Sequence, residues 1–167
     1  MQILSFDGKS LALDEKSLAL EDNSLTSVEN LIDTVSSTDL LDLPIIGNVS
    51  AGVPIEAISQ TGNYVQVPAD IFKERPTYLL RVKGDSMEEA GILDGDLIAV
   101  KKTDTAEEGA FIVARIGNEV TVKELQVENG RPVLIPHNKN YEPMFVAPEE
   151  FVVEGVFVGL LRNRRYH

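Results

Sequence analysis

The sequence has 167 residues, 43% of them hydrophobic, and carries a formal net charge of -12 at pH 7. This length and hydrophobic content suffice for one domain with its own core plus an extension. The lack of cysteine excludes a disulfide framework, a thiolate zinc site and a cysteine nucleophile, and it fits a reducing compartment. The acidic balance argues against a surface that follows nucleic-acid phosphates, because such surfaces cluster Lys and Arg.

The N-terminal sequence MQILSFDGKS has neither a basic region nor an apolar run of signal-peptide length. No later stretch approaches the roughly 20 consecutive apolar residues that a membrane helix needs. We therefore expect a soluble, unexported, cytoplasmic protein with no membrane partner.

Residues 1–43 are the most acidic part of the chain, with nine Asp and Glu against two Lys. They contain a seven-residue repeat, SLALDEK, SLALEDN and SLTSVEN, but two of the three positions that a coiled coil needs apolar are charged. The leucine pairs fit short strands, and the apolar positions from Val28 to Val35 fit one face of a short helix. The alternative is a mobile acidic arm with marginal local structure. The segment is too acidic and too poor in apolar residues for a helix-turn-helix.

From Pro44 onward, short β-type runs alternate with turn signals. The runs are IIGNVS, NYVQV, TYLLRVKG, DLIAVKK, GAFIVARIG, EVTVKELQV, RPVLI and EGVFVGLLR. Gly117-Asn118 and Asn129-Gly130 each predict a two-residue hairpin turn of the type that tolerates positive φ. The sequence thus predicts a mostly β domain over residues 44–167, with antiparallel sheets or a partly open barrel, after an acidic N-terminal arm over residues 1–43.

Three features could carry chemistry. Ser86 stands on a polar turn, where a lone serine is more often structural than catalytic.

Lys123 shares a strand face with Leu125, so it is either a lysine that extends to solvent from a strand edge or a buried general base. A base must lose its proton, which requires burial to lower the lysine pKa by several units. The segment IIGNVSAGVP places Ala51-Gly52, a bond with little side-chain bulk, before Pro54; it is either a strand that ends in a turn or a peptide suited to a narrow cleft.

Together the segments IIGNVSAG, RVKGDSMEEAGILDGDLIAVKK and VARIGNEVTVKEL resemble the self-cleaving serine peptidase domain, of S24 type, shared by LexA repressors, UmuD-type mutagenesis proteins and many phage repressors. The resemblance covers residues 44–163. Its three elements match in order and spacing, with 35 residues from Ala51 to Ser86 and 37 more to Lys123.

The resemblance implies a Ser-Lys dyad in which Ser86 is the nucleophile and Lys123 the base. The oxyanion would lie against the backbone amides of Asp85 and Ser86. Cleavage would fall between Ala51 and Gly52, with Val49 and Ser50 bound in the cleft. No metal or cofactor is implied, and His137 and His167 would be bystanders.

The resemblance also implies partners. In the relatives, a RecA filament on single-stranded DNA stimulates self-cleavage, and the EGVFVGLLR segment resembles their C-terminal dimer strand, so we expect a homodimer. The acidic arm stands where LexA relatives carry a winged helix-turn-helix, so we expect no direct DNA binding. The layout resembles UmuD, which implies an accessory subunit of an error-prone DNA polymerase in the SOS response. The alternative is a LexA-like repressor relative, or an anti-repressor that acts on a repressor protein. A further reading is a β-module without enzymatic activity, kept for protein binding.

Overall fold

Strands rich in Val, Ile and Leu dominate the computed structural model, which describes residues 39–47 and 62–163. This part of the chain holds nine strands and two short 3-10 helices: β1 (Leu40–Ile46), β2 (Tyr64–Pro68), η1 (Ala69–Ile71), β3 (Tyr78–Arg81), η2 (Glu88–Ala90), β4 (Leu97–Lys101), β5 (Phe111–Ile116), β6 (Glu119–Glu128), β7 (Arg131–Ile135), β8 (Met144–Phe145) and β9 (Phe151–Leu161). The prediction of a mostly β domain is confirmed.

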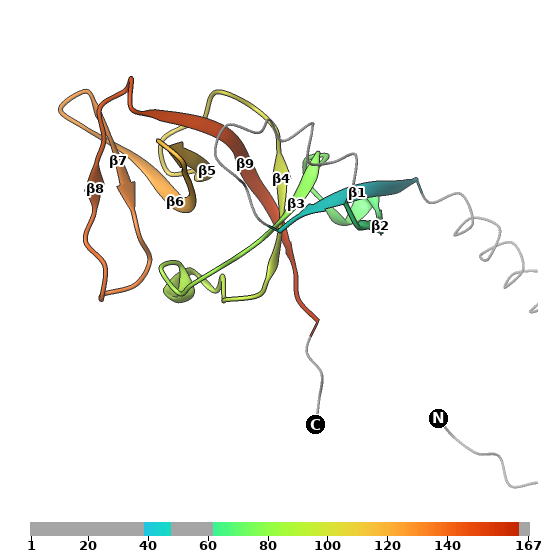
Figure 1. Cartoon of the computed structure of the whole chain (residues 1–167). Helices are drawn as coiled ribbons and strands as arrows, with labels where there is room; N and C mark the ends of the chain where they lie inside the picture. The colour runs from blue at the N-terminus through green and yellow to red at the C-terminus, as the bar shows by residue number, and fades with distance from the viewer. Residues whose placement is uncertain (1–38, 48–61, 164–167) are drawn as a thin grey trace, which may run out of the picture. The chain divides into compact units, whose positions relative to one another are not determined.

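The strands form one sheet in the order β2-β1-β3-β4-β9-β5-β6-β7-β8 (Figure 1). Every pairing is antiparallel except that of β1 with β3, which is parallel. The C-terminal strand β9 lies between β4 and β5, so it joins the two halves of the sheet. Strand β9 is therefore an interior strand of the sheet, although β4 and β5 each pair with only part of its length.

Both predicted hairpins are present. Ile116 pairs with Glu119 across the Gly117-Asn118 turn, and Glu128 pairs with Arg131 across the Asn129-Gly130 turn. Asn129 and Gly130 have φ values of 51° and 76°, the left-handed conformation that a tight hairpin turn requires. These turns fix the register of β5, β6 and β7.

Strand β9 bends at two irregularities in its register, one opposite Ala99/Val100 and one opposite Val113/Ala114. Gly155 lies beside the second irregularity in close contact with β4. A Cβ at Gly155 would lie 2.5 Å from Val100 Cγ1, so only glycine fits there without a shift of β4.

Three clusters of buried apolar side chains make the core. The first surrounds Tyr78 and Ile98 and includes Met87, the second joins β1 to β3 and β4, and the third packs β5 against β6 and β7. Strand β1 contributes Leu41, Leu43 and Ile46, each at most 5% exposed. Residues 40–43, which the sequence reading assigned to the arm, thus lie in the first strand.

Several expectations concern residues outside the described ranges: the repeat and short helix of residues 1–38, the cleavage region Val49 to Gly52, and His167. The short strand β8 was not expected from the sequence. None of the described helices is long and apolar enough to cross a membrane.

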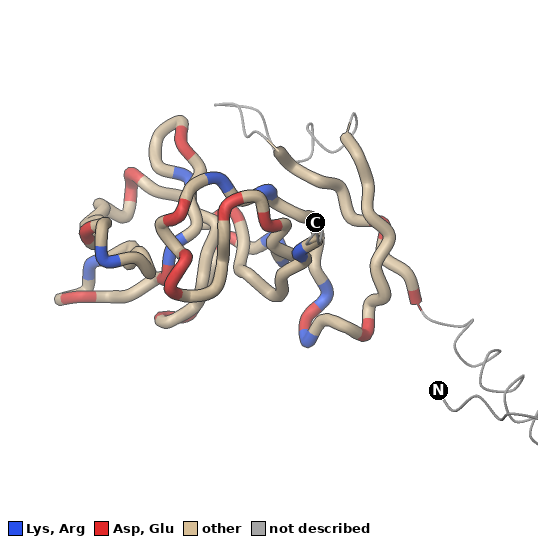
Figure 2. The backbone as a smooth tube through the Cα atoms, turned by 90° about the horizontal axis from the view of Figure 1, so that it is seen from below, with Lys and Arg blue, Asp and Glu red and all other residues tan. Residues whose placement is uncertain are grey.

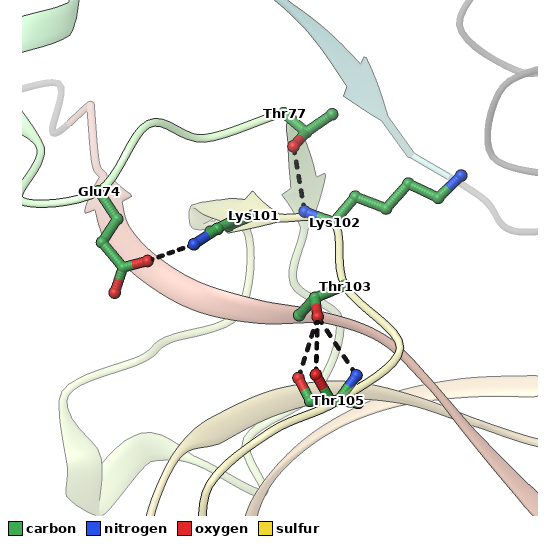
Figure 3. Close-up of polar contacts among 6 residues, drawn as sticks. All are labelled: Glu74, Thr77, Lys101, Lys102, Thr103 and Thr105. Carbon is green, nitrogen blue, oxygen red and sulfur yellow. Dashed lines mark hydrogen bonds and ion pairs between the residues drawn. The ribbon is translucent and has the colours of Figure 1, made fainter.

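Charged residues of both signs are spread along the described chain, as Figure 2 shows. One polar group at the end of β4 is drawn in Figure 3: Lys101 Nζ lies 2.7 Å from Glu74 Oε2, and the Lys102 amide donates to Thr77 Oγ1. In the following loop, Thr103 Oγ1 accepts a hydrogen bond from the amide of Thr105.

Candidate functional site: a serine and a lysine at the edge of β6

Ser86 lies in a long loop between β3 and β4, which we call the serine loop (residues 82–96). Before the serine, Gly84 adopts a φ of 83° that favours glycine, and its amide donates to Asp94 Oδ1 at 2.7 Å. After the serine, Met87 is 2% exposed and packs into the core. The backbone is therefore anchored on both sides of Ser86.

A bidentate ion pair connects the last residue of the serine loop, Asp96, to the residue that follows β9, Arg162. Arg162, just after β9, donates from Nε and Nη2 to the two carboxylate oxygens of Asp96, at 2.7 and 2.6 Å. Asp96 is 3% exposed, and its Oδ2 also accepts the Leu93 amide. Arg162 Nη2 reaches the Gly91 carbonyl as well. The C-terminal strand thus holds the loop that carries the serine.

Lys123 lies in β6 and is 5% exposed. Its Nζ is 2.7 Å from Ser86 Oγ, 2.7 Å from Thr121 Oγ1 and 2.9 Å from the Val122 carbonyl oxygen. Three acceptors surround one nitrogen inside the protein. The structure therefore brings together the two residues that the sequence selected as nucleophile and base.

Burial lowers the pKa of Lys123 from its usual value of 10.5 to about 8, because a low-dielectric surrounding disfavours the ammonium form. With a pKa of about 8, about one lysine in ten is neutral at pH 7, against about one in three thousand at the usual value. Burial alone thus raises the fraction of the basic form several hundredfold.

The partners of Nζ also suit a neutral amine. Such an amine has two N–H donors and one lone pair. With the donors directed to Thr121 Oγ1 and the Val122 carbonyl, the lone pair faces the Ser86 hydroxyl. Protonated Nζ donates to Ser86 Oγ, whereas in the neutral state the serine hydroxyl donates its hydrogen bond to the lone pair of Lys123, which is the direction that nucleophile activation requires.

The peptide unit before Ser86 is also held in place. The Asp85 carbonyl accepts hydrogen bonds from the Glu88 amide at 3.1 Å and from Asn138 Nδ2 at 2.9 Å. Because a peptide unit is planar, these bonds also fix the direction of the Ser86 N–H. An oxyanion site at the amides of Asp85 and Ser86 stays a prediction, but one of its two donors has a fixed orientation.

A cleft of about 340 Å³ opens beside the serine. Its walls come from three places: the end of β3 with the start of the serine loop, the turn and first residues of β6, and Gly47 at the end of β1. Ser86 and Thr121 both line it. Gly47 is the last described residue before the segment that contains Ala51 and Gly52, so the chain enters that segment at the cleft.

Sequence reasoning missed two side chains near the dyad. Thr121 could have been found, because it lies two residues from Lys123 on the same strand face. Asn138, which is 3% exposed, could not, because nothing in one sequence distinguishes a buried loop asparagine from an ordinary turn residue. His137, expected to be a bystander, places its imidazole Nε2 2.5 Å from Glu124 Oε2.

Comparison with known proteins agrees with this site. A family model described as peptidase S24-like matches residues 44–158. The chain belongs to the peptidase S24-like family, in agreement with the LexA and UmuD resemblance of its sequence.

Curated proteins with similar sequences include several LexA repressors. That of Alcanivorax borkumensis is 52% identical over 122 residues, which cover 73% of this chain and 60% of the relative. That of Bordetella avium is 48% identical over 134 residues, 80% of this chain and 63% of the relative. That of Cupriavidus pinatubonensis is 50% identical over 131 residues, 77% of this chain and 60% of the relative. The chain thus spans about 60% of the length of these repressors. These relatives favour the LexA-like alternative over the UmuD-like layout.

Proposed function

We propose that this protein is a self-cleaving serine endopeptidase in which Ser86 attacks the Ala51-Gly52 bond and Lys123 is the general base. The observation that carries the proposal is the 2.7 Å distance between Ser86 Oγ and Nζ of a buried lysine. Membership of the peptidase S24-like family supports it independently.

The proposed reaction has two stages, acylation of Ser86 and hydrolysis of the ester. Neutral Lys123 takes the hydroxyl proton as Ser86 Oγ bonds to the carbonyl carbon of Ala51, and the amides of Asp85 and Ser86 stabilise the oxyanion. The C–N bond then breaks, and the Gly52 nitrogen takes the proton from Lys123. Water, deprotonated by Lys123, hydrolyses the ester on Ser86. The products are fragments of 51 and 116 residues.

The substrate segment lies in the same chain as the dyad. The cleft beside Ser86 includes Gly47, four residues before Ala51. Four residues of extended chain span about 13 Å. We propose that Val49 and Ser50 enter this cleft and present the bond to Ser86. A partner that binds the competent arrangement would raise its population and so the cleavage rate; a RecA filament on single-stranded DNA is the partner to test.

We place the protein among LexA-like regulators of the DNA-damage response. The similarity to LexA repressors at 48–52% identity supports this role over that of a polymerase subunit. Such a protein would act on transcription, either as a repressor relative or by interfering with a repressor. We also propose a homodimer, in which the parts of β9 that β4 and β5 leave uncovered could pair with a second copy. Co-purification with a LexA repressor would support the regulatory role, and co-purification with an error-prone DNA polymerase would support the other.

Intact mass spectrometry tests the peptidase activity. The wild type and Ser86→Ala would be incubated at pH 10, where Lys123 is neutral, and at pH 7 with and without RecA filament. We expect a single cut between Ala51 and Gly52 in the wild type and none in Ser86→Ala. An intact wild-type chain under all of these conditions would refute the proposal and indicate a fold kept for binding alone.

A further inference from the structure

The segment that follows β7 runs along the serine loop and contacts the backbone on both sides of Ser86. The His137 amide donates to the Ser86 carbonyl at 2.8 Å. Asn138 Nδ2 donates to the Asp85 carbonyl at 2.9 Å. These two carbonyls belong to the peptide units before and after the nucleophile. Neighbouring residues of one segment therefore orient both peptide units that flank Ser86.

Further bonds join the same two segments. The Glu89 amide donates to the His137 carbonyl at 2.8 Å, and the Lys139 amide donates to Glu89 Oε1 at 3.1 Å. Asn138 Oδ1 accepts the Asn140 amide at 2.9 Å, which fixes the orientation of the Asn138 side chain. Because Asn138 is 3% exposed, water cannot readily replace the hydrogen bonds of its side chain.

The side chain of His137 links this segment to the strand of the lysine. Its Nε2 lies 2.5 Å from Oε2 of Glu124, the residue next to Lys123 in β6. The ring also packs edge-on against Phe111 of β5, with 5.1 Å between ring centroids. His137 thus contacts the serine loop through its backbone and the lysine strand through its imidazole.

We propose that His137 and Asn138 are positioning residues, which hold the Ser86 backbone in register with Lys123 through the His137–Glu124 pair. This inference rests on the proposed peptidase function and assigns a role to a histidine that takes no proton from the serine. Asn138 sets the direction of the Ser86 amide toward the oxyanion, and His137 sets the distance between the loop and β6. Neither residue needs to touch the substrate.

Cleavage rates at pH 10 test the positioning role, because Lys123 is neutral there and changes in its pKa no longer affect the rate. We expect His137→Ala and Glu124→Ala each to cleave at least tenfold more slowly than the wild type. The double variant should be no slower than the slower single variant, because both changes break one link. His137→Gln, whose amide can still donate to Glu124, should recover to within about threefold of the wild type. Glu74→Ala, which removes an ion pair drawn in Figure 3, is the matched control and should cleave at the wild-type rate.

Asn138→Asp tests the second contact without a change in side-chain size. It replaces the donor to the Asp85 carbonyl by an acceptor, so we expect at least a tenfold lower rate at pH 10. Asn63→Asp makes the same change at an exposed position and should leave the rate unaltered.

Amide hydrogen exchange gives a readout that does not depend on peptidase activity. In the Ser86→Ala background, Asn138→Asp and His137→Ala should each raise the exchange rate of the Glu89 amide at least tenfold. The exchange rates of core amides in β4 should stay unchanged. Wild-type exchange at Glu89 together with wild-type cleavage in these variants would overturn the positioning role. A wild type that never cleaves would overturn the peptidase function instead, and the exchange data would still decide the positioning.

Discussion

Oγ of Ser86 and Nζ of Lys123 lie 2.7 Å apart although 37 positions separate the two residues in the chain. Lys123 lies in the part of β6 that pairs with β5. The pairing of β6 with β7 begins one residue later, at Glu124. In the proposed peptidase, a buried amine at this distance would make the protonation state of Lys123 the variable that controls the rate.

The cleavage rate should follow the ionisation of Lys123. Its pKa of about 8 predicts a rate that rises about tenfold per pH unit below pH 8 and levels off above it. Single-turnover cleavage followed by denaturing gels from pH 6 to pH 10.5 measures this profile. A plateau reached only above pH 10 would show that the lysine is not desolvated in the active state.

Burial of Lys123 should destabilise the fold at neutral pH. The folded pKa of about 8 lies below the usual 10.5, so the unfolded chain binds the proton more tightly. The penalty, about 3 kcal/mol, is fully present below pH 8 and fades as pH rises to 10.5. In the Ser86→Ala background, Lys123→Met should unfold at higher urea concentration than its parent at pH 7, and the difference should shrink by pH 10.5. A lower midpoint for Lys123→Met at pH 7 would contradict a buried neutral amine.

Thr121 should assist by orienting the amine. Thr121→Val keeps the shape but removes the acceptor 2.7 Å from Nζ, so we expect about a tenfold slower cleavage, corresponding to one hydrogen bond to a functional group. Thr103→Val is the matched control, because the Thr103 hydroxyl bonds to Thr105, two residues further along the loop of Figure 3. Equal rates in the two variants would remove Thr121 from the site.

The Arg162–Asp96 pair should contribute more to stability than an exposed pair. Arg162→Ala removes the guanidinium that binds both carboxylate oxygens of the 3% exposed Asp96, so we expect a clear fall in the urea midpoint of unfolding. Lys101→Ala breaks a pair whose side chains are about half exposed, so it should change the urea midpoint much less. Urea denaturation of both variants at pH 7 makes the comparison, and equal costs would show that Asp96 gains little from Arg162.

The elements best predicted from the sequence are those with local signals. Alternating residues predicted β4 to β7, and the Asn129-Gly130 turn set the register of two of them, because positive φ at these residues favours that turn. The resemblance to a known family selected Ser86 and Lys123 together. Composition alone supported neither residue, since each has a common structural explanation.

Other features could not be predicted because they depend on contacts distant in sequence. Strand β1 begins at Leu40 because Leu41 and Leu43 are buried against β3 and β4. The acidic residues around these leucines led to their assignment to the acidic arm. The position of β9 inside the sheet depends on its pairing with both β4 and β5, which are distant from it in the sequence. Asn138 has its role only because the serine loop folds back onto it.

Strand β1 also determines the physical state of the cleaved protein. It precedes Ala51 and would therefore belong to the N-terminal fragment, yet it pairs with β2 through five residues and with β3 through two, and three of its apolar side chains are buried. Hydrolysis would therefore produce a nicked complex whose two pieces remain associated. The fragments should elute together in native gel filtration and separate only in denaturant. Dissociation of the first fragment would be a separate, slower event, and it would give the protein a delay between the chemical cut and its consequence.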